Sequence, residues 1–105
     1  MWICFNDGFV SAVQSKTDPD TLVIRARQLK DLENVVGSDR NIIVGGGTDY
    51  MYRTEMSKVD WAKIVALRII DTDYSNFKNS VKRGPLRNLY LKMWNLHYNY
   101  QSHFS

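Results

Sequence analysis

Two short apolar runs separated by turn-forming residues open the chain and restrict its fold most strongly. The runs are Trp2–Phe5 and Phe9–Gln14, and Asn6-Asp7-Gly8 lies between them. An Asp-Gly pair between two such runs is typical of a tight β-hairpin, because glycine adopts the positive φ that these turns need. The chain is therefore predicted to begin with two antiparallel strands.

The next apolar run, Thr21–Arg27, is predicted to be a third strand that ends with two arginines. Side chains alternate between the two faces of a strand. Leu22, Ile24 and Ala26 then form the core face. Arg25 and Arg27 lie on the other face, about 6–7 Å apart along the strand.

The rest of the chain alternates between helical and strand patterns. The pattern predicts a helix over Gln28–Val36 that ends at Gly37, followed by a hairpin of Asn41–Val44 and Tyr50–Met56. A broadly buried helix over Lys58–Asp71, capped by Ser57, comes next. The last two predicted elements are a short helix capped by Asp73 and an amphipathic helix over Leu86–Tyr100 whose tail frays. This order predicts a single α+β domain over residues 1–105, with an antiparallel sheet of about five strands and helices packed on one face.

Charge and cysteine content limit the class of protein. The chain has 14 Lys and Arg, 11 Asp and Glu, a net charge of +3 and one cysteine, Cys4. One cysteine excludes an intrachain disulfide framework. No apolar run approaches the ~20 residues that cross a membrane, and no signal peptide is seen. We expect a cytoplasmic protein without a membrane partner, whose mild basicity permits nucleotides or nucleic acid as ligands.

Arg25 and Arg27 are the first candidate site. Two guanidinium groups on one face can hold a phosphate or carboxylate through bidentate hydrogen bonds. The alternative is that both arginines are solvated or form intrachain salt bridges to residues such as Asp31 or Glu33.

The segment Gly45–Arg53, "GGGTDYMYR", is the second candidate. Its glycines expose backbone N–H groups that can form an anion nest, and Thr48, Tyr50 and Tyr52 can hydrogen-bond to a base or stack on it. The spacing is neither that of a P-loop nor that of a dinucleotide fingerprint. A flexible hairpin turn is the alternative. In a regular strand Arg53 faces away from both tyrosines, so a bulge at the glycines would be needed to bring all three together.

No catalytic or metal site stands out. Both histidines, His97 and His103, lie near the C-terminus and do not share a helical face. The "DTDYSNFK" segment lacks the histidine and cysteine that a metal cluster there would need, and helix capping by Asp73 explains it better. We therefore expect no cofactor, no metal and no enzymatic activity.

The C-terminal helix carries more aromatic residues than one buried stripe needs. Trp94 and Tyr98 are neighbours at i and i+4, and Tyr100 follows. These three residues either pack in the core and at its edge, or anchor an interface with a host protein or a second copy of the chain.

Four segments, "MWICFNDGFVSAVQ", "LVIRARQLKDLE", "TDYMYR" and "DYSNFKNSV", resemble a family of small proteins encoded by many bacteria and phages. The resemblance covers nearly the whole chain and brings no catalytic residue with it. It implies a bacterial or phage source and, by association, a role against host defences.

Two hypotheses follow. The first is a non-enzymatic module that binds an anionic ligand, a nucleotide or nucleic acid, through Arg25, Arg27 and Arg53, with Thr48, Tyr50 and Tyr52 beside them. The second is a protein-interaction or inhibitor module, homodimeric or bound to a host protein, that uses Trp94, Tyr98 and Tyr100.

Overall fold

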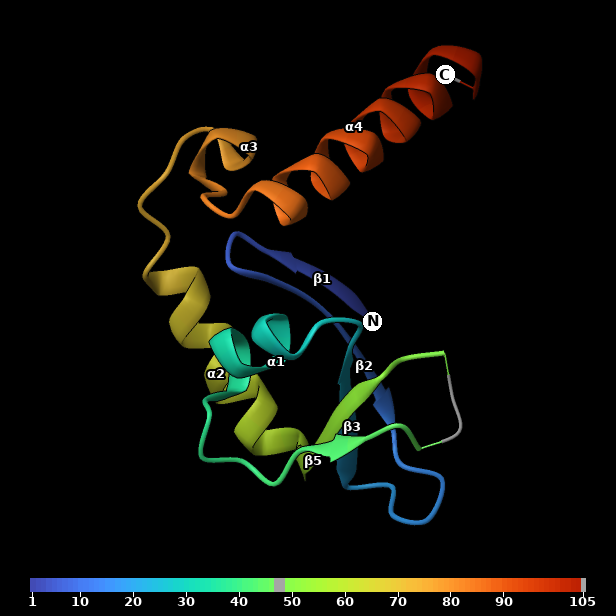
Figure 1. Cartoon of the computed structure of the whole chain (residues 1–105), viewed down its shortest axis with the longest axis vertical. Helices are drawn as coiled ribbons and strands as arrows, with labels where there is room; N and C mark the ends of the chain where they lie inside the picture. Colours follow the sequence, from blue (N-terminus) through green and yellow to red (C-terminus); the bar gives the residue numbers. More distant parts are fainter. Residues whose placement is uncertain (47–48, 105) are drawn as a thin grey trace.

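A five-stranded antiparallel sheet forms the centre of the protein (Figure 1). The computed structural model describes residues 1–46 and 49–104. The strands are β1 (Trp2–Phe5), β2 (Gly8–Gln14), β3 (Thr21–Ala26), β4 (Ile43–Val44) and β5 (Tyr52–Ser57). Their order across the sheet is β1-β2-β3-β5-β4, and each neighbouring pair is antiparallel. The predicted α+β class and the two hairpins are confirmed.

Four helices complete the described residues: α1 (Leu29–Val36), α2 (Lys58–Ile70), α3 (Phe77–Ser80) and α4 (Gly84–Phe104). α1 ends where predicted, because Gly37 takes a φ of 94° and its N–H donates to the Glu33 carbonyl. α2 begins at the predicted cap, where the Ser57 hydroxyl accepts a hydrogen bond from the Asp60 N–H at 3.0 Å.

The main core lies between the sheet and the first two helices. Alternate residues of the three central strands, among them Val10, Ile24 and Met56, pack against Leu32 of α1 and Trp61 of α2. α1 and α2 thus occupy one face of the sheet. The prediction that the helices pack on one face holds for these two and is wrong for α4, which packs on the other face.

A second, smaller cluster lies on the opposite face of the first hairpin. Val81, Leu86 and Tyr90 pack there against Cys4 and Phe9. These two strand residues are paired in register and point away from the main core. Figure 1 shows β1 and β2 between α1 and α4, so the C-terminal helix adds a layer on the side that α1 and α2 leave uncovered.

Three details of the helices differ from the sequence prediction. α2 is mostly exposed rather than broadly buried: Trp61 is its buried residue, whereas Leu67 and Ile70 are 61% and 75% exposed. α3 is capped by Asn76, whose side chain accepts from the Asn79 N–H, and not by Asp73. α4 continues to Phe104 instead of fraying after Tyr100.

Candidate anion-binding site

One residue from each strand forms a row across the face of the sheet opposite α1 and α2. Trp2 pairs with Ser11, Ser11 with Arg25, Arg25 with Arg53, and Arg53 with Ile43. Residues paired in this way share a face, with Cβ atoms about 5 Å apart. The row therefore places Arg25 and Arg53 directly opposite each other on β3 and β5.

Arg25 has neutral and aromatic neighbours. Its Nη2 donates to the Ser11 hydroxyl at 2.9 Å, and its guanidinium carbon lies 4.4 Å from the centre of the Tyr50 ring. Among the residues that the structure describes, no carboxylate lies within ion-pair distance of Arg25, and its buried Nε has no hydrogen-bond partner. Its charge is therefore not neutralised by a carboxylate at that distance.

Arg27 lies just after β3 and contacts the same tyrosine. Its guanidinium carbon is also 4.4 Å from the centre of the Tyr50 ring. Nη1 donates to the Asp49 carbonyl at 2.9 Å, and Nη2 is 3.4 Å from the Asp49 carboxylate. Both side chains of this ion pair are more than half exposed, so the pair contributes at most about 1 kcal/mol and can exchange for another anion.

The two predicted tyrosines do not share a face, which corrects the expectation that both lie together. Tyr50 precedes β5, so strand alternation does not extend to it, and it turns toward Arg25 and Arg27. It is 4% exposed, so its ring holds the two arginines rather than offering a surface for a base. Tyr52 lies in the strand and packs against the main core. Thr48 lies outside the described residues.

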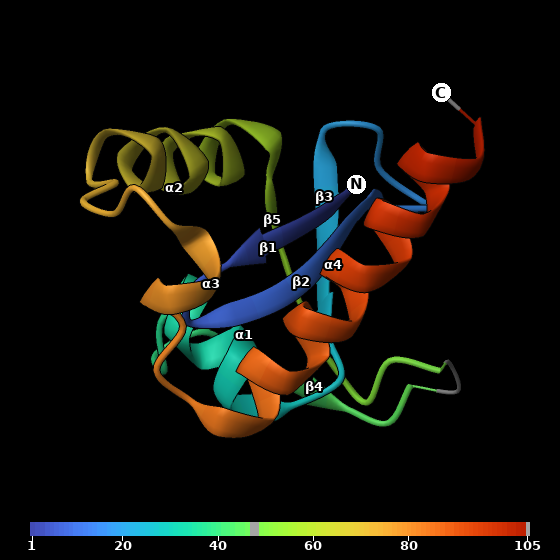
Figure 2. The same cartoon turned by 90° about the horizontal axis from the view of Figure 1, so that it is seen from above.

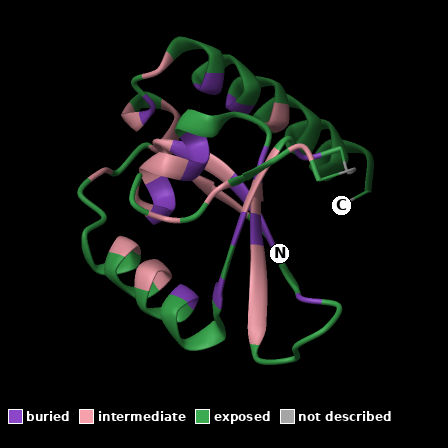
Figure 3. Cartoon of the chain, turned by 60° about the horizontal axis from the view of Figure 1, so that its bottom comes forward, coloured by how far each residue is buried: buried purple, intermediate pink, exposed green. Residues whose placement is uncertain are grey.

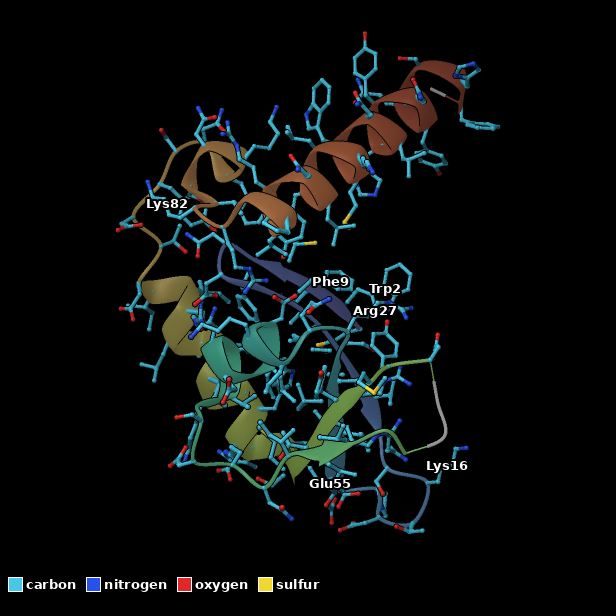
Figure 4. All side chains as sticks on the ribbon, in the orientation of Figure 1. Trp2, Phe9, Lys16, Arg27, Glu55 and Lys82 are labelled. Carbon is cyan, nitrogen blue, oxygen red and sulfur yellow. The ribbon has the colours of Figure 1, made fainter. Side chains whose placement is uncertain are left out.

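A shallow hollow of about 380 Å³ borders the row. Among the described residues, the cationic side chains of Lys16, Arg25 and Arg53 line it together with the carboxylate of Glu55. Figure 4 shows Lys16 and Glu55 at the end of the sheet away from α4, with Trp2, Phe9 and Arg27 nearer to that helix. The excess of cations suits an anionic ligand.

The glycine segment contributes by its backbone shape. Gly46 has a φ of 70°, and a Cβ built on it would lie 3.0 Å from Nε of Arg53. The positive φ favours glycine here, and a side chain at this position would press on the Arg53 guanidinium.

Sequence reasoning missed Trp2 and Lys16. Trp2 is 71% exposed and packs edge-to-face on Phe9, with ring centres 5.9 Å apart. The two-residue turn of the first hairpin fixes the pairing of Trp2 with Ser11, so the alternation within β1 could have placed Trp2 on the outer face. Lys16 lies in a loop, for which no pattern in the sequence gives a direction.

The predicted interface residues lie on the exposed part of α4. The rings of Trp94 and Tyr98 stack with centres 5.6 Å apart, and the Lys78 ammonium lies 4.2 Å from the centre of the Trp94 ring. Tyr100 is 68% exposed. These side chains do not contribute to the row of arginines.

Metal binding, thiol reactivity and membrane crossing have little support among residues 1–46 and 49–104. No group of three or more His, Cys, Asp or Glu side chains there could hold a metal ion. Burial raises the pKa of the Cys4 thiol, which opposes formation of a thiolate. In the same residues, no helix is both long and apolar enough to cross a membrane.

Comparison of the chain with models of known protein families, with curated proteins and with solved structures found no match.

Proposed function

We propose that this protein is a non-enzymatic module that binds a phosphate-bearing ligand on the outer face of its sheet. The observation that carries the proposal is the direct opposition of Arg25 and Arg53 on neighbouring strands, with Arg27 next to them. Like charges that face each other across two strands destabilise a sheet. An anion bound between the two guanidinium groups would be attracted by both of them.

Each part of the row has a role in this proposal. The guanidinium groups would form charge-assisted hydrogen bonds with phosphate oxygens. Tyr50 would keep Arg25 and Arg27 in position, and the exposed Trp2 would stack on a base. Trp2 lies two strands away from Arg25, about 10 Å at the usual strand spacing, which is within the reach of a nucleotide unit.

Nucleotides and single-stranded nucleic acid share this chemistry, and titration distinguishes them. A fluorescently labelled single-stranded oligonucleotide, a nucleoside triphosphate and inorganic phosphate would each be titrated at low and high salt. Binding of an oligonucleotide through several phosphates weakens steeply with salt. The resemblance to small phage and bacterial proteins extends the proposal to a role against host defence through capture of a nucleotide signal.

The first prediction concerns Arg25→Gln combined with Arg27→Gln. Each lost charge-assisted contact is worth about 1.5–3 kcal/mol, so we expect affinity to fall at least about tenfold. The matched control is Lys63→Gln combined with Lys92→Gln, which removes the same charge from exposed positions on α2 and α4. Equal affinities of the two double variants, or no binding of any of the three ligands at low salt, would contradict the proposal.

A second variant separates a loss of binding from a loss of folding. It is needed because Arg25 and Arg27 contact the buried Tyr50, so their replacement could disturb the fold. Lys16 is exposed and lines the same hollow. Lys16→Gln should leave the circular dichroism spectrum unchanged and still weaken binding severalfold. Unchanged affinity in this variant would place the ligand away from the hollow.

A further inference from the structure

Residues on one side of α4, the side that packs on the sheet at the start of the helix, follow a strict heptad spacing. Alternate steps of four and three residues connect Leu86, Tyr90, Met93, His97, Tyr100 and Phe104. This is the spacing of the a and d positions of a coiled coil, which lie on one side of the helix. We call these six residues the α4 seam.

The sheet covers only the first half of the seam. Leu86 and Tyr90 are 3% and 4% exposed, whereas Tyr100 and Phe104 are 68% and 78% exposed. Figures 1 and 2 both show the last turns of α4 extending past the sheet, and Figure 3 shows the buried residues of α4 confined to its beginning. The radius of gyration, 14.8 Å, exceeds the roughly 13 Å of a compact domain of about 100 residues.

The uncovered half of α4 is apolar enough to form an interface. Leu96 and Trp94 flank the seam and are 68% and 47% exposed. Each aromatic or leucine side chain exposed to this degree offers on the order of 100 Å², so pairing through Tyr100, Phe104 and these two residues would bury on the order of 400 Å² per partner. That is about half of the ~800 Å² per partner of a standard interface, which suits a reversible dimer.

The lack of charged residues in this segment indicates which kind of partner packs on it. Residues 93–104 contain no Asp, Glu, Lys or Arg. Lys78 of α3 lies beside the Trp94 ring at the edge of this surface, but an acidic or basic partner would find no countercharge within the segment itself. Helices that lie on membranes usually carry Lys and Arg on their polar side, which this segment lacks. A second copy brings the same uncharged apolar surface and meets no like-charge repulsion.

We propose that two copies of this chain form a symmetric dimer by packing the exposed halves of their α4 seams against each other. The helices run antiparallel near Tyr100. A parallel pairing would place the first half of the partner helix where the sheet already covers Leu86 and Tyr90. In the antiparallel arrangement the sheets of the two copies lie at opposite ends of the helix pair. The dimer does not depend on the proposed anion site.

Sedimentation equilibrium of the full chain from low to high micromolar concentration tests the dimer. The wild type should sediment as a dimer. Tyr100→Glu combined with Phe104→Glu should weaken dimerisation at least tenfold, because each carboxylate would be buried in an apolar seam. Both residues are exposed in the single chain, so the variant should still fold.

The control places the same two charges on the opposite side of α4. Asn95→Glu combined with Ser102→Glu should leave the dimer intact. A monomeric wild type, or a dimer that persists in the seam variant, would overturn the proposal. So would binding of a monomeric wild type to neutral phosphatidylcholine vesicles, which would assign the face to a membrane surface.

Cross-linking tests the orientation. In a Cys4→Ser background, Tyr100→Cys places one thiol near the expected two-fold axis, and Asn95→Cys places one thiol on the outer side. Oxidation should give a disulfide-linked dimer for position 100 only. Efficient linking at position 95, or none at position 100, would exclude the antiparallel seam.

Discussion

Gly8 begins β2 directly against the backbone of α1. A Cβ at this position would lie 2.6 Å from the Asp31 carbonyl oxygen, closer than any real Cβ contact. The φ of Gly8 is not positive, in contrast to those of Gly37, Gly45 and Gly46. The Asp-Gly pair therefore marks the predicted hairpin, but the physical reason for the glycine is the close approach of a helix and not the conformation of the turn.

We expect Gly8→Ala to destabilise the fold by about 1–3 kcal/mol, the usual cost of forcing atoms into a packed site. The midpoint of urea denaturation measures the change in stability. Gly84→Ala is the control, because a Cβ there meets nothing within 4 Å and alanine favours a helix. If both variants shift the midpoint equally, close contact with α1 does not constrain position 8.

At the scale of the elements, Tyr90 fixes α4 to β1. Its hydroxyl donates to the Phe5 carbonyl at 2.8 Å, and its ring lies 5.2 Å from that of Phe77 in α3. Burial raises the pKa of the Tyr90 hydroxyl well above its ordinary value. The folded protein therefore keeps this side chain neutral at pH values where an unfolded chain would ionise it.

The direction of the Tyr90 shift predicts a loss of stability in alkali. A tyrosine in the unfolded chain ionises near pH 10, so the stabilisation is fully present below about pH 10 and decreases as the pH rises further. Urea denaturation between about pH 8 and 11 measures this decrease. Tyr90→Phe should cost about 1 kcal/mol at neutral pH and show a shallower decrease. Equal slopes for both proteins would contradict this assignment.

Strands defined by alternation and the cap of α2 were predicted well, whereas the cap of α3 and the burial of α2 were not. The β3 residues alternate clearly, and Ser57 with Asp60 marks the start of α2. The apolar residues of α2 are numerous, but only the side that carries Trp61 meets the sheet. How many residues of a helix become buried depends on how much of the sheet lies beneath it. The sequence of the helix itself does not contain that information.

At the scale of the whole molecule, one buried carboxylate connects the two apolar clusters. Asp31 of α1 is 5% exposed, accepts a hydrogen bond from the Phe9 N–H and forms an ion pair with Arg83, which lies just before α4. Phe9 packs in the second cluster, whereas the neighbouring Leu32 packs in the first. The ion pair thus links packing on the two faces of the sheet.

Removing either partner of this pair should uncouple the clusters. We expect Asp31→Asn or Arg83→Gln to cost up to about 3 kcal/mol, because each leaves a poorly paired group behind. Hydrogen exchange should show faster opening of α4 than of α1 in both variants. The double variant should cost clearly less than the two single variants together, and simple additivity would mean that the pair does not connect the clusters.

The candidate site could be predicted only in part, because it depends on how distant strands pair. The sequence identified Arg25, Arg27 and Arg53 and placed the first two on one face. The opposition of Arg25 and Arg53 requires β3 and β5 to be neighbours, although α1 and β4 separate them in the chain. No local pattern encodes that pairing.

The row across the sheet also affects how such a protein can evolve. Each strand contributes one outward residue to it, and the residues on either side of that position face the opposite layer. Substitutions along the row therefore change the outer surface while the interior that specifies the fold stays the same. A lineage with this architecture can acquire a new ligand through a few surface substitutions, so its recognition properties can diverge faster than its shape.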